Sequence, residues 1–135
     1  MKINVLGKIY IALMSVYFVV SGFNALLDID AKLARIGLSA IDFDGKIAFI
    51  LIYCSLMIGI GFSIALLYYV SKIWQYSAIV ALIIVSSFIS FRLVGLYMLG
   101  DISNTQLAFL ATELLEVAIG ICLIYKSGKF NQPIN

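Results

Sequence analysis

"SFISFRLVGLYMLGDISNTQLAFLATELLEV", residues 87–117, decides the fold, because it holds two apolar runs joined by a short polar connection. The first run carries Arg92 among mostly apolar neighbours, and the second carries Glu113 and Glu116. A charged side chain inside an apolar segment needs water or a partner of opposite charge. The stretch therefore predicts a hairpin of two helices whose charged groups face each other.

The composition of the whole chain is that of an integral membrane protein. Of its 135 residues, 64% are hydrophobic and 12% are charged, and the mean hydropathy is +1.12. Soluble domains have about 45–50% apolar and about 25% charged residues. The length allows one membrane domain, residues 1–135. The net charge of +2 comes from scattered basic residues, which gives no indication of nucleic-acid binding.

Helices that cross the membrane follow from the apolar segments. A helix needs about 20 residues to cross a hydrocarbon core of about 30 Å. Four segments meet this requirement, at residues 9–27, 47–70, 74–99 and 107–125. The sequence thus predicts an all-α fold, an antiparallel four-helix bundle that spans the membrane up, down, up and down.

The polar connections contain further helix signals. In the 19-residue loop after the first span, Ile29, Leu33 and Ile36 share one helical face, which favours a short interfacial helix. Before the fourth span, Ser103 and Gln106 have capping-box spacing, so the fourth helix is expected to begin there.

The positions of lysine and arginine predict the orientation. One side of the membrane holds five lysines and no acid: Lys2, Lys8, Lys72, Lys126 and Lys129. The other side holds three basic residues and five aspartates. Both termini are therefore predicted to be cytoplasmic. The first span could also be a signal peptide, but an uncleaved anchor is favoured because its apolar character continues to Leu27.

The hairpin places its charged groups at one depth. At 1.5 Å per residue, Arg92 lies about 15 Å before the turn and Glu113 about 16 Å after it. Glu116 lies one turn deeper on the same face, so one carboxylate is left without a basic partner. Other polar side chains fall in the same outer half and extend this predicted site: Asn24, Tyr53 and Tyr97, with Asp44, Lys46 and Asp101 at its rim.

Each of these features also has a structural interpretation. The charged cluster could only fix the packing of the last two helices, or Arg92 could extend its head group to the membrane surface. Ser55, Gly59 and Ser63 form a small-residue stripe typical of close helix packing. Asp42 and Asp44 are expected to cap the second helix rather than bind a ligand.

Several chemistries are excluded by what the sequence lacks. The chain has no histidine, which excludes histidine-ligated haem and the usual zinc, copper and di-iron sites. Cys54 and Cys122 are expected in opposite halves of the bundle and should not pair. We therefore assign no metal site, no cofactor and no catalytic residue.

Three segments carry a resemblance to a known family: "DFDGKIAFILIY", "FRLVGLYMLGD" and "ATELLEVAIGICLIY". They resemble an uncharacterised bacterial family of four-transmembrane proteins, a domain of unknown function that is broadly DoxX-like. The matching positions are Arg92, Gly95, Asp101 and Glu113 or Glu116. The resemblance implies a bacterial inner-membrane location but no reaction. The family has arginine after the acid where this chain has Lys46, so it assigns no role to Lys46.

Three functions fit the sequence. The first is binding of a small amphiphilic or lipid-like molecule by the polar site, with Arg92 contacting an anionic or carbonyl group. The second is an accessory subunit that packs in a homodimer or a larger membrane complex. The third is a proton-coupled transporter. An enzyme ranks below all three.

Overall fold

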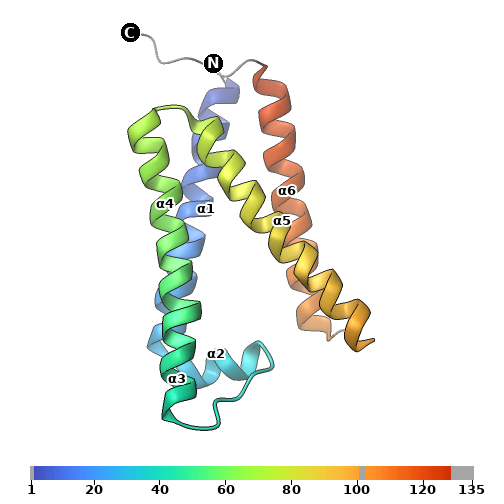
Figure 1. The fold of residues 1–135 in the computed structure, drawn as a ribbon. Helices are drawn as coiled ribbons and strands as arrows, with labels where there is room; N and C mark the ends of the chain where they lie inside the picture. The colour runs from blue at the N-terminus through green and yellow to red at the C-terminus, as the bar shows by residue number, and fades with distance from the viewer. Residues whose placement is uncertain (1, 101–102, 129–135) are drawn as a thin grey trace.

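The computed structural model describes residues 2–100 and 103–128, and these residues form helices and connections with no strand (Figure 1). Asp101 and Lys129, used in the predictions of the rim and the orientation, lie outside the described residues. The elements in chain order are α1 (Lys2–Leu27), α2 (Ile29–Arg35), α3 (Phe43–Phe49), η1 (Ile50–Ser55), α4 (Leu56–Ser71), α5 (Trp74–Leu99) and α6 (Asn104–Ser127).

Four rods of this fold are long and apolar enough to cross a membrane. They are α1, the continuous helix Phe43–Ser71 formed by α3, η1 and α4, and then α5 and α6. The protein is thus an all-α, multi-pass membrane protein. The first, second and fourth helices extend beyond the ranges expected from hydropathy, whereas α5 begins and ends where the sequence indicates.

Aspartate side chains in the first loop cap the N-termini of the two short helices α2 and α3. Asp28 accepts a hydrogen bond from the Ala31 amide at 3.0 Å and caps α2. Asp42 accepts from the Gly45 amide at 2.8 Å and caps α3. A short helix therefore lies in the first loop, and in Figure 1 it runs sideways from the end of α1. Leu33 of α2 is buried, which anchors this helix on the α1 side of the fold.

The four rods are arranged as two pairs. α1 packs most extensively against α4, and α5 packs against α6 (Figure 1). The pairs are close together where α1 begins and α6 ends, and they diverge toward the end that holds α2.

The distribution of buried residues follows this divergence. α1 has buried residues along most of its length, from Gly7 to Ala25. The buried residues of α5 end at Val85, and α6 buries Gly120. The shared core thus occupies one half of the bundle, which leaves the two pairs open to each other in the other half.

Glycines allow the close approaches within the core. A Cβ at Gly7 would lie 2.4 Å from the ring of Trp74, which joins α1 to α5. A Cβ at Gly61 would lie 2.6 Å from the Ser15 carbonyl oxygen, and the Ser15 hydroxyl donates to the Gly61 carbonyl at 2.7 Å. These contacts set the spacing of α1 against α5 and α4.

Candidate functional site

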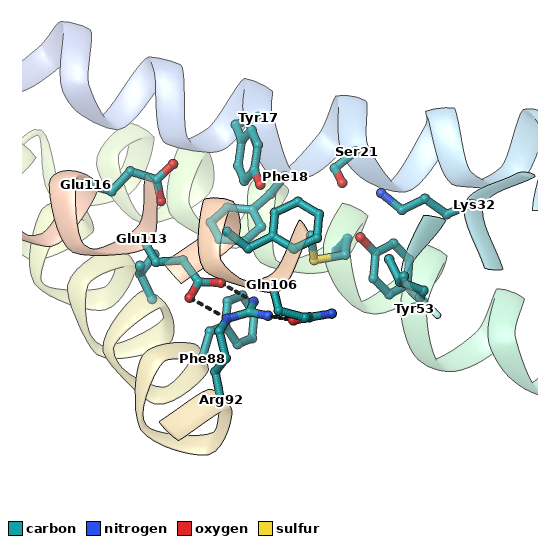
Figure 2. A pocket seen from close by; sticks show the side chains of 14 residues that line it. Tyr17, Phe18, Ser21, Lys32, Tyr53, Phe88, Arg92, Gln106, Glu113 and Glu116 are labelled. Atoms are coloured by element: carbon teal, nitrogen blue, oxygen red, sulfur yellow. Dashed lines mark hydrogen bonds and ion pairs between the residues drawn. The ribbon is translucent and has the colours of Figure 1, made fainter. Parts of the chain in front are cut away.

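Arg92 of α5 and Glu113 of α6 form an ion pair with two hydrogen bonds (Figure 2). Arg92 Nε donates to Glu113 Oε2 at 3.0 Å, and Nη2 donates to Oε1 at 2.6 Å. Nη1 donates to the side-chain oxygen of Gln106. The two charged side chains are 20% and 13% exposed, so the pair is partly buried. We call Arg92, Glu113 and Gln106 the hairpin network.

The local sequence explains why these groups meet. Gly100 ends α5 in the left-handed conformation, with φ of 70°. Ser103 begins α6 by accepting a hydrogen bond from the Gln106 amide at 3.3 Å. This short connection places Arg92 and Glu113 at similar distances from the turn. The hairpin network therefore ties the C-terminal part of α5 to α6, and among the described residues it makes no hydrogen bond to the α1–α4 pair.

A cavity of about 270 Å³ lies between the two helix pairs, bounded on one side by the hairpin network. Its apolar wall comes from all four rods and consists mainly of Tyr17, Phe18, Met57, Val85, Phe88 and Phe109. Its polar side chains are Ser21, Lys32, Tyr53, Arg92, Gln106, Glu113 and Glu116. The cavity thus combines aromatic surfaces with charged groups of both signs.

Two charged groups of the cavity remain outside the ion pair. Glu116 lies beside Tyr17 at one end of the cavity (Figure 2), and the described residues offer its carboxyl no hydrogen bond or ion pair. Lys32 of α2 lies at the opposite end, with its Nζ 5.1 Å from the centre of the Tyr53 ring. The charges of Glu116 and Lys32 are therefore separated along the cavity.

The π-helical segment η1 carries Tyr53 to this cavity. The Tyr53 ring stacks on Phe49 with centroids 5.1 Å apart, and the neighbouring Cys54 is buried in the cluster formed with Leu33. A π-helical turn changes which side chains share a face, and such turns are frequent at functional sites. Tyr53 therefore lines the cavity, whereas the adjacent Cys54 packs in the cluster beneath α2.

Four of the six residues expected in the pocket line the cavity: Arg92, Glu113, Glu116 and Tyr53. Asn24 is exposed and lies outside the lining, about two turns of α1 beyond Tyr17. Tyr97 is 91% exposed. It follows Arg92 by five residues, about 140° further around the helix, so it faces away from the cavity.

The two described residues expected at the rim, Asp44 and Lys46, lie apart from the cavity lining. Lys46 forms an ion pair with Asp30, with its Nζ 2.7 Å from Oδ1, and thereby links α3 to α2. Asp44 is exposed in the first turn of α3. Lys32, which the sequence did not single out, takes the position at the mouth.

Gln106 and Tyr17 were also missed by sequence reasoning. Gln106 was expected to complete a capping box, but its side chain accepts from Arg92 instead. A signal was present, because Gln106, Phe109, Glu113 and Glu116 recur at helical spacing on one face of α6. All four line the cavity.

Comparison of the chain with family models, with curated proteins and with solved structures finds no match. The resemblance to DoxX-like proteins therefore stays a prediction. Within residues 2–100 and 103–128, no three histidine, cysteine, aspartate or glutamate side chains gather as metal ligands.

Proposed function

We propose that the protein is an inner-membrane protein with cytoplasmic termini that binds a small amphiphile in the cavity between its helix pairs. One observation carries the proposal: a single cavity joins the hairpin network to a wall of aromatic and aliphatic side chains. Ligand pockets combine a mostly apolar lining with a few polar groups that fix orientation. An amphiphile has both matching parts.

The divergence of the helix pairs supports entry from the lipid. α5 and α6 separate from α1 and α4 toward the α2 end, where the large side chains of α5 are exposed (Figure 1). Because all four rods are apolar enough to cross a membrane, the exposed side chains of α5 contact acyl chains in a bilayer. An amphiphile dissolved in the bilayer can reach the cavity sideways through this separation.

The size of the cavity limits the ligand. A volume of about 270 Å³ lies just below the range of about 300–1,000 Å³ for drug-sized ligands. It accommodates a head group and a short apolar segment. A longer tail would extend between the pairs into the lipid.

The hairpin network gives the ligand a rigid polar wall. A guanidinium has five N–H donors in a fixed plane. Glu113 and Gln106 accept three of them. The described residues accept no hydrogen bond from its two remaining N–H groups, and the bonds already made hold the guanidinium in place.

A photoreactive octanol with a diazirine on its chain tests the proposal in lipid nanodiscs. We expect crosslinks, mapped by mass spectrometry, on the lining residues Val85, Phe88 and Phe109, and we expect unlabelled octanol to compete. Ser21→Phe fills the cavity and should reduce these crosslinks at least tenfold. Val20→Phe is the matched control, because Val20 is exposed and lies outside the lining.

The proposal fails if crosslinks are spread over the lipid-facing surface and Ser21→Phe leaves them unchanged. It also fails if no crosslink on the lining is reduced by competition with unlabelled octanol.

Cysteine labelling tests the proposed orientation. A membrane-impermeant maleimide should label Ser39→Cys, in the loop between α2 and α3, in intact spheroplasts. Lys2→Cys should label only after the membrane is disrupted, since the five lysines on that side favour a cytoplasmic location. The unsubstituted chain is the control for its own cysteines. If Lys2→Cys is labelled in intact spheroplasts and Ser39→Cys is not, the orientation is the opposite of the one proposed.

A further inference from the structure

Glu116 is the carboxyl group of the cavity that the described residues leave unpaired. Its side chain is partly buried, lines the cavity and lies beside Tyr17 (Figure 2). The backbone of Glu116 is held in place, because the Tyr10 hydroxyl donates to its carbonyl oxygen at 3.2 Å. An ionisable group at this depth in a membrane protein marks a site of function more often than of simple packing.

No basic side chain of the lining is placed to pair with Glu116. The guanidinium of Arg92 is held by two hydrogen bonds to Glu113 and a third to Gln106. Lys32 lies at the other end of the cavity, above the Tyr53 ring. The deep end of the cavity therefore has an acid whose counter-charge the described chain does not supply.

Three aromatic side chains line the cavity together with Glu116, and Tyr17 is the one that lies beside it. Tyr17 and Phe18 contact edge to face with centroids 5.5 Å apart, and Phe18 contacts Phe88 in the same manner at 6.3 Å. These three rings line the cavity from α1 to α5. The faces of aromatic rings attract cations, and more strongly where water is excluded.

We propose that the amphiphile bound in this cavity carries a protonated amine and that Glu116 is its binding residue. This inference rests on the proposed function, since it names the head group of the same ligand. The ammonium donates hydrogen bonds to the Glu116 carboxylate and lies against the aromatic rings, and the apolar chain follows the wall toward the opening between the helix pairs.

An anionic head group fits the deep end less well. It would add negative charge beside Glu116 and Glu113, of which only Glu113 is neutralised by an ion pair. The unpaired cation that could receive it, Lys32, lies at the mouth, where water is available as a substitute partner. The charge distribution of the lining thus favours an amine over a carboxylate or phosphate.

Competition against the photoreactive octanol tests the head group. The competitors share one chain length and differ in charge: octylamine, octyltrimethylammonium, octanoate and octanol. Each competitor is used at the same concentration in the bilayer. Each variant is compared with the wild type, so that differences in how the competitors partition into the bilayer cancel. We expect octylamine to displace the probe at least tenfold better than octanol or octanoate, with octyltrimethylammonium between them because it cannot donate a hydrogen bond.

Glu116→Gln keeps the shape of the side chain and removes its charge, and we expect it to abolish the advantage of octylamine while octanol still competes. Asp44→Asn is the matched control, since it removes a negative charge at an exposed residue outside the cavity lining and should alter octylamine competition less than twofold.

The amine assignment is overturned if octanol and octylamine compete equally, or if the octylamine advantage survives Glu116→Gln. It is also overturned if octanoate competes best and Lys32→Gln removes that advantage. In each case the cavity remains an amphiphile site. Absence of any specific probe binding would instead overturn the proposed function.

Discussion

Replacing Arg92 with leucine is expected to lower the free energy of unfolding by about 3 kcal/mol, the low end of the effect of breaking a buried ion pair. The low end applies because the side chains of Arg92 and Glu113 are 20% and 13% exposed. The substitution leaves Glu113 without its counter-charge and Gln106 without its donor. SDS titration in mild detergent, followed by the fluorescence of Trp74, measures the change.

The double variant Arg92→Leu with Glu113→Leu is the control for this result. It removes both charges, and replacement of a whole ion pair by apolar residues is often neutral or stabilising. We expect it to unfold within about 1 kcal/mol of the wild type. If the double variant loses as much free energy of unfolding as Arg92→Leu and Glu113→Leu lose together, the two groups do not stabilise each other.

Replacing Gly61 with alanine is expected to cost about 2 kcal/mol, in the range of substitutions that overpack a core. The added Cβ would lie 2.6 Å from the backbone oxygen of Ser15, and a backbone atom cannot move aside without displacing α1 from α4. The same titration applies to this variant.

Gly59→Ala is the matched control, two residues away on the same helix. A Cβ at Gly59 meets nothing within 4 Å. Alanine is favoured over glycine in a helix by about 1 kcal/mol, so this variant should be unchanged or slightly more stable. Equal effects of the two substitutions would contradict the close contact between α1 and α4.

The helices could be predicted from the sequence because their cause is local. An apolar run of sufficient length must satisfy its backbone internally, so hydropathy alone located the four rods. The turn at Gly100 and the cap at Ser103 also depend on nearby residues. The meeting of Arg92 and Glu113 followed from counting residues along one hairpin.

The arrangement of the rods could not be predicted in this way. In a membrane, lipid is as apolar as a leucine side chain, so hydrophobicity does not distinguish a packed face from an exposed one. Nothing in the sequence therefore indicated that the helix pairs diverge. The positions of Asn24 and Lys32 depend on that divergence and on the placement of α2, which involve distant parts of the chain. The outward direction of Tyr97, in contrast, follows from its helical spacing from Arg92.

The unequal separation of the helix pairs gives the molecule a wedge shape (Figure 1). It therefore occupies more area in the leaflet that holds α2 than in the opposite leaflet. Many copies in one patch of membrane would therefore favour a bilayer that is convex on the side of α2.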